Sequence, residues 1–262
     1  MAAVAFLTQG FVLSRHLPRL YCDVPLGLLA PVVFVEAQAH YVRSVMRLKE
    51  GDAVRVFNGR EGEYLVVLSE VGKKNVHGTV QQILRPQSRL SGVHLAFVPI
   101  KPNRLAFMLE KAVELGVASL TPVISQRCQV RDLKVDKLKA HIIEASEQCE
   151  RLDVPYLYDA ISLEDFLKNA PFKRVLAADE RRCAPALLAI AQQPGYDGES
   201  TAVLVGPEGG FSEDEFGMMA AQSKITPFSL GETILRAETA ALAAIATLHQ
   251  AMIGQTGLEG KA

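Results

Sequence analysis

Short apolar runs separated by polar loops dominate the last third of the chain. Residues 202–205 and 225–228 are runs of the length and composition of buried strands in a parallel sheet. A glycine-containing loop follows each run, at 206–210 and at 230–236. Ligands of open α/β sheets bind outside the carboxyl ends of the strands, so this pattern predicts a pocket floored by the two loops.

The N-terminal third has a different pattern, with short strands and turn signals. We predict strands at 31–35, 53–57, 63–68 and 74–84, with an Asn58-Gly59 turn between the second and third. One segment, 40–48, has a near-helical apolar period, which would put Arg43 and Arg47 on one helix face. Residues 18–90 are therefore predicted to form a small barrel with one short helix.

Beyond a linker at 85–89, predicted strands and helices alternate. Strands at 94–98, 120–124 and 174–178 alternate with helices at 103–115, 138–151 and 163–169, as in βαβ units with a parallel sheet. Gly116 is a predicted C-cap, and Ser212 to Glu215 form a capping box that opens a helix over 213–223. The helix at 237–253 is alanine-rich and apolar almost all round, which places it in the core or in a subunit interface. The predicted class is α/β with a small all-β N-terminal domain.

Composition excludes several classes of protein. No apolar run reaches the roughly 20 residues that a membrane-spanning helix needs. The four cysteines form no Cys-x-x-Cys pair and the six histidines show no ligand spacing, which favours reduced thiols in a cytosolic protein and no metal site. Residues 1–91 carry 11 basic and 7 acidic side chains, while the rest of the chain has a net charge of −5. This asymmetry indicates a basic N-terminal module, although a solvated charged face would look the same.

Candidate chemistry gathers at the two loops and near one helix. The loop Gly206-Pro207-Glu208-Gly209-Gly210 lacks the spacing of a P-loop, a dinucleotide fingerprint or a nucleophile elbow, so it indicates a pocket, or a plain turn, without naming a ligand. On the helix at 138–151, Glu144, Gln148 and Arg151 are spaced i, i+4, i+7 and face either a cleft or solvent. Basic residues also follow the strand at 120–124, namely Arg127, Arg131 and Lys134.

Four segments of the chain together match a known family. They are His40 to Leu48 with Gly51-Asp52 and Phe57-Asn58-Gly59; Glu110 to Val117; Glu144 to Arg151; and Val205 to Ser212 with Leu230 to Ala240. With these segments the chain resembles the bacterial 16S ribosomal RNA uridine N3-methyltransferase family (ribosomal small subunit methyltransferase E) of the SPOUT superfamily. The segments span roughly 18–255 in the family's order. Asp179-Glu180 lies where the family has a loop near its cofactor, and residues 1–16 look like an N-terminal extension.

The resemblance implies a two-domain organisation and a cofactor. A PUA-like RNA-binding barrel at 17–88 would precede a SPOUT α/β methyltransferase domain at 89–256 with a deep trefoil knot, which nothing in the periodicity indicates. S-adenosylmethionine would bind in the knot of a cytoplasmic homodimer, and the substrate would be 16S ribosomal RNA or the small ribosomal subunit. No metal and no membrane are implied.

The resemblance and the loop pattern assign residues to roles. We expect Arg236 to stabilise the uracilate or a phosphate, unless it pairs with Glu238 or Glu208, and Glu208 to be the proton acceptor or an organiser of its loop. The expected cofactor-binding residues are Leu204, Val205, Gly206, Pro207, Gly210, Leu230, Gly231, Ile234, Leu235 and Thr239. The expected RNA-binding residues are Arg19, Arg43, Arg47, Lys49, Arg127, Arg131, Glu147, Gln148 and Arg151.

Two other functions stay open at this point. A non-enzymatic RNA-binding protein of ribosome assembly would keep both domains and bind RNA without the cofactor. A methyltransferase of the same superfamily acting on another position, such as a ribose 2′-hydroxyl, would bind the cofactor and make a different product. A metal-dependent hydrolase is disfavoured because ligand clusters are missing from the sequence.

Overall fold

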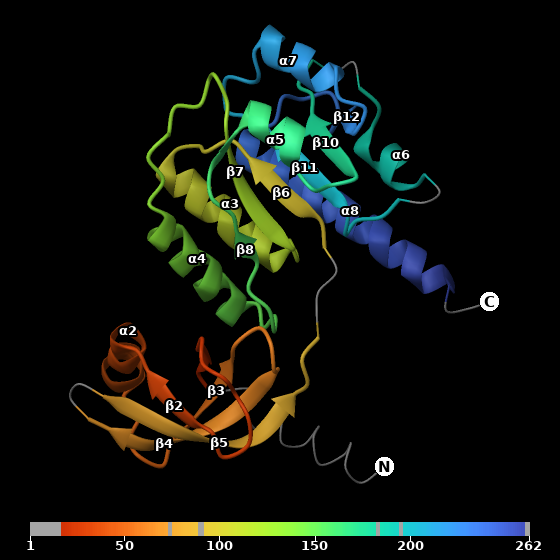
Figure 1. Cartoon of the computed structure of the whole chain (residues 1–262). Coiled ribbons are helices and arrows are strands. Elements are labelled where there is room, and N and C mark those ends of the chain that lie inside the picture. The colour runs from red at the N-terminus through yellow and green to blue at the C-terminus, as the bar shows by residue number, and fades with distance from the viewer. Residues whose placement is uncertain (1–16, 73–74, 89–91, 182–183, 194–195, 260–262) are drawn as a thin grey trace. The chain divides into compact units, whose positions relative to one another are not determined.

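The computed structural model describes residues 17–72, 75–88, 92–181, 184–193 and 196–259 (Figure 1). The predicted extension at 1–16 lies outside these residues. Contacts divide the chain into two units. The first, called the β unit, holds the chain up to Arg89 together with Ser146–Val154, and the second, called the α/β unit, holds Leu90–Ala145 and the chain from Pro155 onward.

The β unit is built on one five-stranded sheet, in the order β1-β3-β4-β5-β2. Its strands are β1 (Arg19–Tyr21), β2 (Pro31–Phe34), β3 (Ala53–Phe57), β4 (Glu63–Val71) and β5 (Val76–Arg85). The four predicted strands are confirmed, and Lys74, where the last of them was predicted to begin, lies outside the described residues. The sequence analysis missed β1, whose three residues are too few to show a period and which pairs parallel to β3.

One helical segment of the β unit differs from its prediction. Helix α2 (Glu36–His40) runs into a π-helical turn, η1 (Tyr41–Val45), so the segment begins and ends earlier than 40–48. Ala39 and Val42 are the buried positions that hold it on the sheet. Arg47 lies beyond the helix with a φ of +56°, so the prediction that Arg43 and Arg47 share one helix face is wrong.

The α/β unit holds a parallel sheet, as predicted, in the order β12-β10-β11-β6-β7-β8 with β9 also paired to β7. The strands are β6 (His94–Phe97), β7 (Ser119–Ile124), β8 (Tyr156–Leu157), β9 (Ile161–Ser162), β10 (Arg174–Ala178), β11 (Thr201–Val205) and β12 (Ile225–Phe228). Strands β8 and β9 were not predicted, because two residues carry no periodicity. The central strand β11 is buried along its whole length.

Helices connect or follow the strands of the α/β unit. They are α3 (Pro102–Glu114), α4 (Val135–Gln148), α5 (Leu163–Asn169), α6 (Leu187–Ala191), α7 (Glu213–Ala220) and α8 (Ala237–Glu259). The end of α4, from Ser146 onward, is counted with the β unit. Side chains of α5 and α7 share one buried cluster with alternate residues of β6, β10 and β11. Helix α8 lies against β6 and β11 and contacts α3 and α6 (Figure 1).

The alanine-rich helix α8 is buried along one side. Ala241, Ala244, Ile245 and Leu248 are fully buried, which confirms the predicted core position for that side. Ile253 is 53% exposed, so the helix is not buried all round. The trefoil knot stays a prediction from the resemblance.

Local signals in the sequence explain how the loops at the sheet are held. The predicted capping box is present, with the Glu215 amide donating to Ser212 Oγ and the Ser212 amide donating to the Glu215 carboxylate. The same buried carboxylate accepts the Gln126 amide at 2.7 Å, which ties the loop after β7 to the loop after β11. Gly116 ends α3 with a φ of +85°, as its C-cap prediction requires.

Among the described residues, no helix combines the length and the hydropathy needed to cross a membrane. The part of the chain that the structure describes also contains no group of three or more His, Cys, Asp or Glu side chains placed to hold a metal ion. Cys22, Cys128 and Cys149 are free thiols, and burial raises the pKa of Cys22 to about 12.

Candidate functional site

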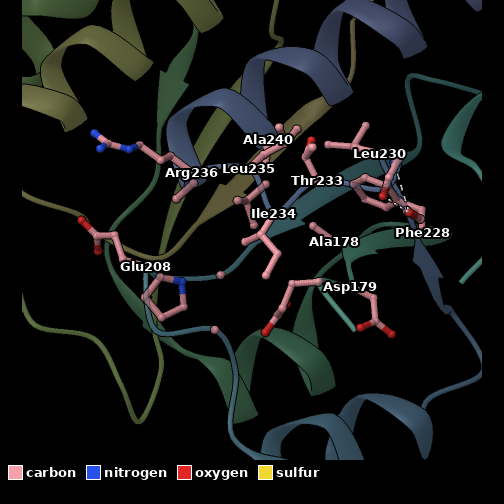
Figure 2. A pocket seen from close by; sticks show the side chains of 18 residues that line it. Ala178, Asp179, Glu208, Phe228, Leu230, Thr233, Ile234, Leu235, Arg236 and Ala240 are labelled. Carbon is pink, nitrogen blue, oxygen red and sulfur yellow. Dashed lines mark hydrogen bonds between the residues drawn. The ribbon is translucent and has the colours of Figure 1, made fainter. Parts of the chain in front are cut away.

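A cavity of about 230 Å³ lies at the carboxyl ends of β10, β11 and β12 (Figure 2). Its lining comes from the three loops that follow these strands and from the first turn of α8. The lining residues are Ala178, Asp179, Glu180, Val205, Gly206, Pro207, Glu208, Gly210, Phe228, Ser229, Leu230, Gly231, Thr233, Ile234, Leu235, Arg236, Ala237 and Ala240. The structure thus brings together the two loops that the apolar runs predicted.

Eight of the ten predicted cofactor-binding residues line this cavity, and two do not. Leu204 is fully buried and points into the cluster with α5 and α7, because neighbouring residues of a strand face opposite sides of the sheet. Thr239 is exposed on α8 and lies outside the lining. For Leu204 the prediction concerned its backbone, so a backbone contact stays a prediction, whereas Thr239 lies away from the cavity.

A third loop follows β10, and the resemblance placed this loop near the cofactor although its residues were not among the predicted contacts. Asp179 and Glu180 line the cavity next to Ala178. The Arg181 guanidinium donates two hydrogen bonds to the Asp179 carboxylate and lies 3.6 Å from the centre of the Phe216 ring. These hydrogen bonds hold the pKa of Asp179 below its usual value. Strand β10 was predicted, so its carboxyl end could have been included by the rule that selected the other two loops.

Glycines shape the loops where side chains would not fit. A Cβ on Gly206 would lie 2.9 Å from the Phe211 ring, which is buried. Gly210 has a φ of +66°, and a Cβ there would meet the Glu180 carboxylate. Gly231 has a φ of +119° with open space beside it. Such a conformation is one that L side chains rarely adopt, so this position requires glycine.

Arg236 and Glu208 extend from the same side of the cavity, away from the lining residues at its centre (Figure 2). Arg236 is exposed and precedes the first turn of α8. Within the described residues, no carboxylate lies within 4.0 Å of its guanidinium, so the alternative of a pair with Glu208 or Glu238 is not observed. Both acids instead face Arg104 of α3, at 4.0 and 3.8 Å.

Arg127, predicted to bind RNA, supports the loop after β11. Its guanidinium donates to the carbonyl oxygens of Gly209 at 2.7 Å and Phe211 at 3.3 Å. Arg104, Arg127 and Arg236 are called the pocket arginines below. They lie at or beside the cavity, and each remains at least partly accessible to solvent.

Arg19, also predicted to bind RNA, is buried in the β unit. Its guanidinium pairs with Glu63 at 2.5 Å and donates to the carbonyl oxygens of Ser146 and Arg151. Glu63 is fully buried and also receives Arg85 at 2.9 Å and Arg55 at 3.9 Å. Arg19, Arg55, Arg85, Glu63 and Glu150 are called the Glu63 cluster below. A guanidinium enclosed in this way cannot reach a phosphate, so the prediction for Arg19 does not fit its burial.

The predicted substrate-side group at 147–151 belongs to the β unit as well. Helix α4 ends at Gln148 and Glu150 has a φ of +60°, so Arg151 does not continue the i, i+4, i+7 series. The Arg151 guanidinium is buried and donates two hydrogen bonds to Asp153, and the Glu147 carboxylate accepts the Tyr21 amide. Gln148 alone of the three predicted residues is exposed.

The remaining predicted RNA contacts are accessible to different degrees. Arg47 and Lys49 are exposed, and Arg131 is exposed in the loop before α4. Arg43 is half-buried and donates to the carbonyl oxygen of Gly72 at 3.1 Å.

Comparison with known proteins agrees with this architecture. A family model for an RNA methyltransferase domain matches residues 86–249, and one for an RNA methyltransferase PUA domain matches residues 36–81. The ribosomal RNA small subunit methyltransferase E of Rickettsia conorii is 36% identical over 210 residues, which cover 80% of this chain and 85% of that protein. The chain belongs to the ribosomal RNA small subunit methyltransferase E family. The resemblance read from the motifs is thereby confirmed, as are the PUA-like and SPOUT fold assignments.

Two solved structures similar to this member of the family contain the expected cofactor. A methyltransferase of Legionella pneumophila in complex with S-adenosylmethionine has a TM-score of 0.80 and 28% identity, over 90% of this chain and 98% of that one. The methyltransferase E of Neisseria gonorrhoeae bound to S-adenosylmethionine has a TM-score of 0.77 and 27% identity over the same shares. The predicted cofactor is thereby confirmed for the family.

Proposed function

We propose that this protein transfers the methyl group of S-adenosylmethionine to N3 of a uridine in 16S ribosomal RNA. The observation that carries the proposal is the cavity at the ends of β10, β11 and β12, with Arg236 at its rim and no carboxylate of the described residues within 4.0 Å of that arginine. Family membership supports an RNA substrate of the small subunit, and a cytoplasmic location follows from that substrate.

The lining of the cavity suits the cofactor. Glycine backbone at 206, 210 and 231 allows close approach of an adenine and a ribose. Asp179 and Glu180 also line the cavity, and their acidic side chains would suit a ligand that carries a sulfonium and an ammonium charge. When bound, this ligand supplies an electrophilic methyl group.

Arg236 and the start of α8 would stabilise the charge that develops on the base. Removing the N3 proton leaves a negative charge shared with O2 and O4 of the uracil ring. An arginine guanidinium at the positive end of a 23-residue helix stabilises such a charge. Because Arg236 has no carboxylate within 4.0 Å among the described residues, its charge remains for the RNA.

Glu208 has two candidate roles, proton acceptor or organiser of the loop after β11. Its pairing with Arg104 at 4.0 Å favours the organiser role, because that pair links the loop to α3.

The proposed phosphate contacts are Arg47, Lys49 and Arg131, which are exposed. Half-buried Arg43 and exposed Gln148 are proposed as further RNA contacts. Each phosphate contact lowers the observed affinity as salt concentration rises. We expect the RNA dissociation constant of the full chain to increase steeply between low and moderate salt. A dissociation constant independent of salt would contradict this set of contacts.

The proposed assembly is a homodimer. Two large apolar side chains of the α/β unit support it, Ile234 at 70% exposure in the cavity lining and Phe107 at 48% exposure on α3. Light scattering of purified protein gives the molar mass directly. A monomer at micromolar concentration would contradict the proposal, and Ile234→Asp tests whether this side chain contributes to the interface.

The first test of the function is calorimetric titration of S-adenosylmethionine into the purified chain. We expect binding that is lost in a Gly206→Val/Gly231→Val variant and retained in Gly217→Ala, where a Cβ meets open space. Mass spectrometry of unmethylated 16S RNA incubated with protein and cofactor then identifies the product. A methylated ribose would favour the 2′-hydroxyl alternative, and RNA affinity without cofactor affinity would favour the assembly protein.

A further inference from the structure

Arg104 lies between two acids, Glu208 and Glu238, near the rim of the cavity where Arg236 lies. It lies in the first turn of α3, with Nη1 4.0 Å from the Glu208 carboxylate and Nε 3.8 Å from the Glu238 carboxylate. Glu208 belongs to the loop after β11 and Glu238 to the first turn of α8. One guanidinium therefore faces acids from the two elements that border the rim of the cavity.

Without Arg104, the buried carboxylate of Glu238 would lack a nearby cation from the described part of the chain. The residue is 8% exposed, and its Oε2 atom is buried without a hydrogen-bond partner among the described residues. A buried carboxylate with an unused acceptor favours any cation within reach. Arg236 lies two residues before Glu238 in the sequence and is exposed, so we take it as a guanidinium that would turn to Glu238 if Arg104 were removed.

We propose that Arg104 is a positioning residue for methyl transfer, which holds the carboxylates of Glu208 and Glu238 and so keeps the Arg236 guanidinium available to the RNA. The inference rests on the proposed function, because the role of Arg104 is to keep Arg236 available for the RNA substrate proposed above. Arg104 acts through its neighbours and does not need to touch the reacting atoms. At 3.8 and 4.0 Å, the Arg104 guanidinium and the two carboxylates are close enough to pair as charges but too far apart for strong hydrogen bonds.

The test compares Arg104→Ala and Arg104→Gln with the wild-type chain. Unmethylated 16S RNA transcribed in vitro is the probe, and the readouts are RNA affinity by fluorescence anisotropy, turnover, and S-adenosylmethionine affinity by calorimetry. We expect RNA affinity to fall about tenfold, the value of one arginine–phosphate contact, while cofactor affinity stays within about twofold. Lys139→Ala, which removes an exposed cation of α4, is the control for loss of charge.

Rescue separates this role from a direct contact between Arg104 and RNA. In Arg104→Ala/Glu238→Gln the carboxylate that would capture Arg236 is neutral, so RNA affinity should recover most of the loss. A double variant no better than Arg104→Ala, or an Arg104→Ala variant equal to Lys139→Ala, would overturn the inference. The proposed function is judged separately, by whether the wild-type chain methylates uridine N3.

Discussion

The Glu63 cluster and the pocket arginines use the same side chain for opposite purposes. In the β unit, Glu63 is fully buried, and the guanidinium groups around it pair with Glu63, with Glu150 and with backbone carbonyls. In the α/β unit, Arg236 is exposed and has no carboxylate within 4.0 Å among the described residues. Whether an arginine can bind a ligand depends on whether neighbouring carboxylates and carbonyls already occupy its guanidinium. The residue type alone does not show this.

The Glu63 cluster and the pocket arginines should also differ in what they contribute to the free energies of folding and of binding. Burial lowers the pKa of Arg19, and the hydrogen bond and charge of Glu63 oppose that shift. The Glu63 cluster is therefore expected to govern stability, whereas the pocket arginines are expected to govern binding and turnover. Each of the following changes tests one side of this division.

Glu63→Gln should have the largest effect on stability. It leaves three guanidinium groups without their shared counter-charge in a buried site, which costs about 3–5 kcal/mol when one partner of a buried ion pair is lost. Urea denaturation followed by circular dichroism measures the loss. Asp23→Asn is the matched control in the same unit, because its pair with Arg60 is exposed on both sides and should matter little. Equal stability of the two variants would contradict the buried role of the cluster.

Arg236→Ala should have the largest effect on function and little effect on stability. Removing one preorganised group that stabilises developing charge lowers turnover by about 10²–10³-fold. We expect cofactor affinity within about twofold of wild type and an unchanged denaturation midpoint. Single-turnover methylation of 16S RNA gives the rate, and full turnover by the variant would remove Arg236 from the site.

Arg127→Ala should lower the affinity for the cofactor more than it lowers the affinity for RNA. The lost hydrogen bonds to the carbonyls of Gly209 and Phe211 free the loop that lines the cavity, and a charged hydrogen bond of this kind contributes about 1 kcal/mol at a partly exposed site. Calorimetry should show a dissociation constant for S-adenosylmethionine about fivefold higher, by the relation between free energy and affinity. Arg131→Ala, in the same segment, should lower RNA affinity and leave cofactor affinity unchanged. The reverse pattern would return Arg127 to the RNA-binding surface.

Glu150→Gln should give the smallest change, and the change should depend on pH. Burial opposes ionisation of Glu150, but the hydrogen bond from Arg55 and the nearby arginine charges outweigh it and lower the pKa. A carboxyl with a lowered folded-state pKa stabilises the protein above its unfolded pKa of about 4.3 and loses this contribution as pH falls through the folded value. The difference in unfolding free energy between variant and wild type should be below about 1 kcal/mol at pH 7 and vanish at low pH. A difference that grows with acidity would contradict this sign.

Elements with a local period were predictable from the sequence. The strands at 53–57 and 174–178 and the helix at 163–169 have the predicted bounds, because alternation and capping act over a few residues. The rule that ligands bind at the carboxyl ends of parallel strands located eight contacts of the cavity. The same rule could not tell which way the Leu204 side chain points, since the last residues of a strand face alternate sides of the sheet.

Contacts between distant residues were not predictable from the sequence. Arg19 lies 44 residues from Glu63 and 132 residues from Arg151, and no local pattern relates them. The charge count over the first 91 residues included Arg19 as a side chain that RNA could reach. In the structure Arg19 is buried, so its charge is not accessible to RNA. Arg104 went unnoticed for the same reason, because its two acids lie in the loop after β11 and in α8.

The inclusion of Ser146–Val154 in the β unit determines how the protein can be divided. Carbonyl oxygens of Ser146 and Arg151 accept from Arg19, and that of Glu150 accepts from Arg85. A fragment that ends at residue 88 would lack these acceptors and would leave buried guanidinium groups unsatisfied. A fragment that begins at residue 89 would carry the same nine residues without the sheet that covers them. Domain exchange between relatives therefore has to transfer this segment together with the N-terminal strands.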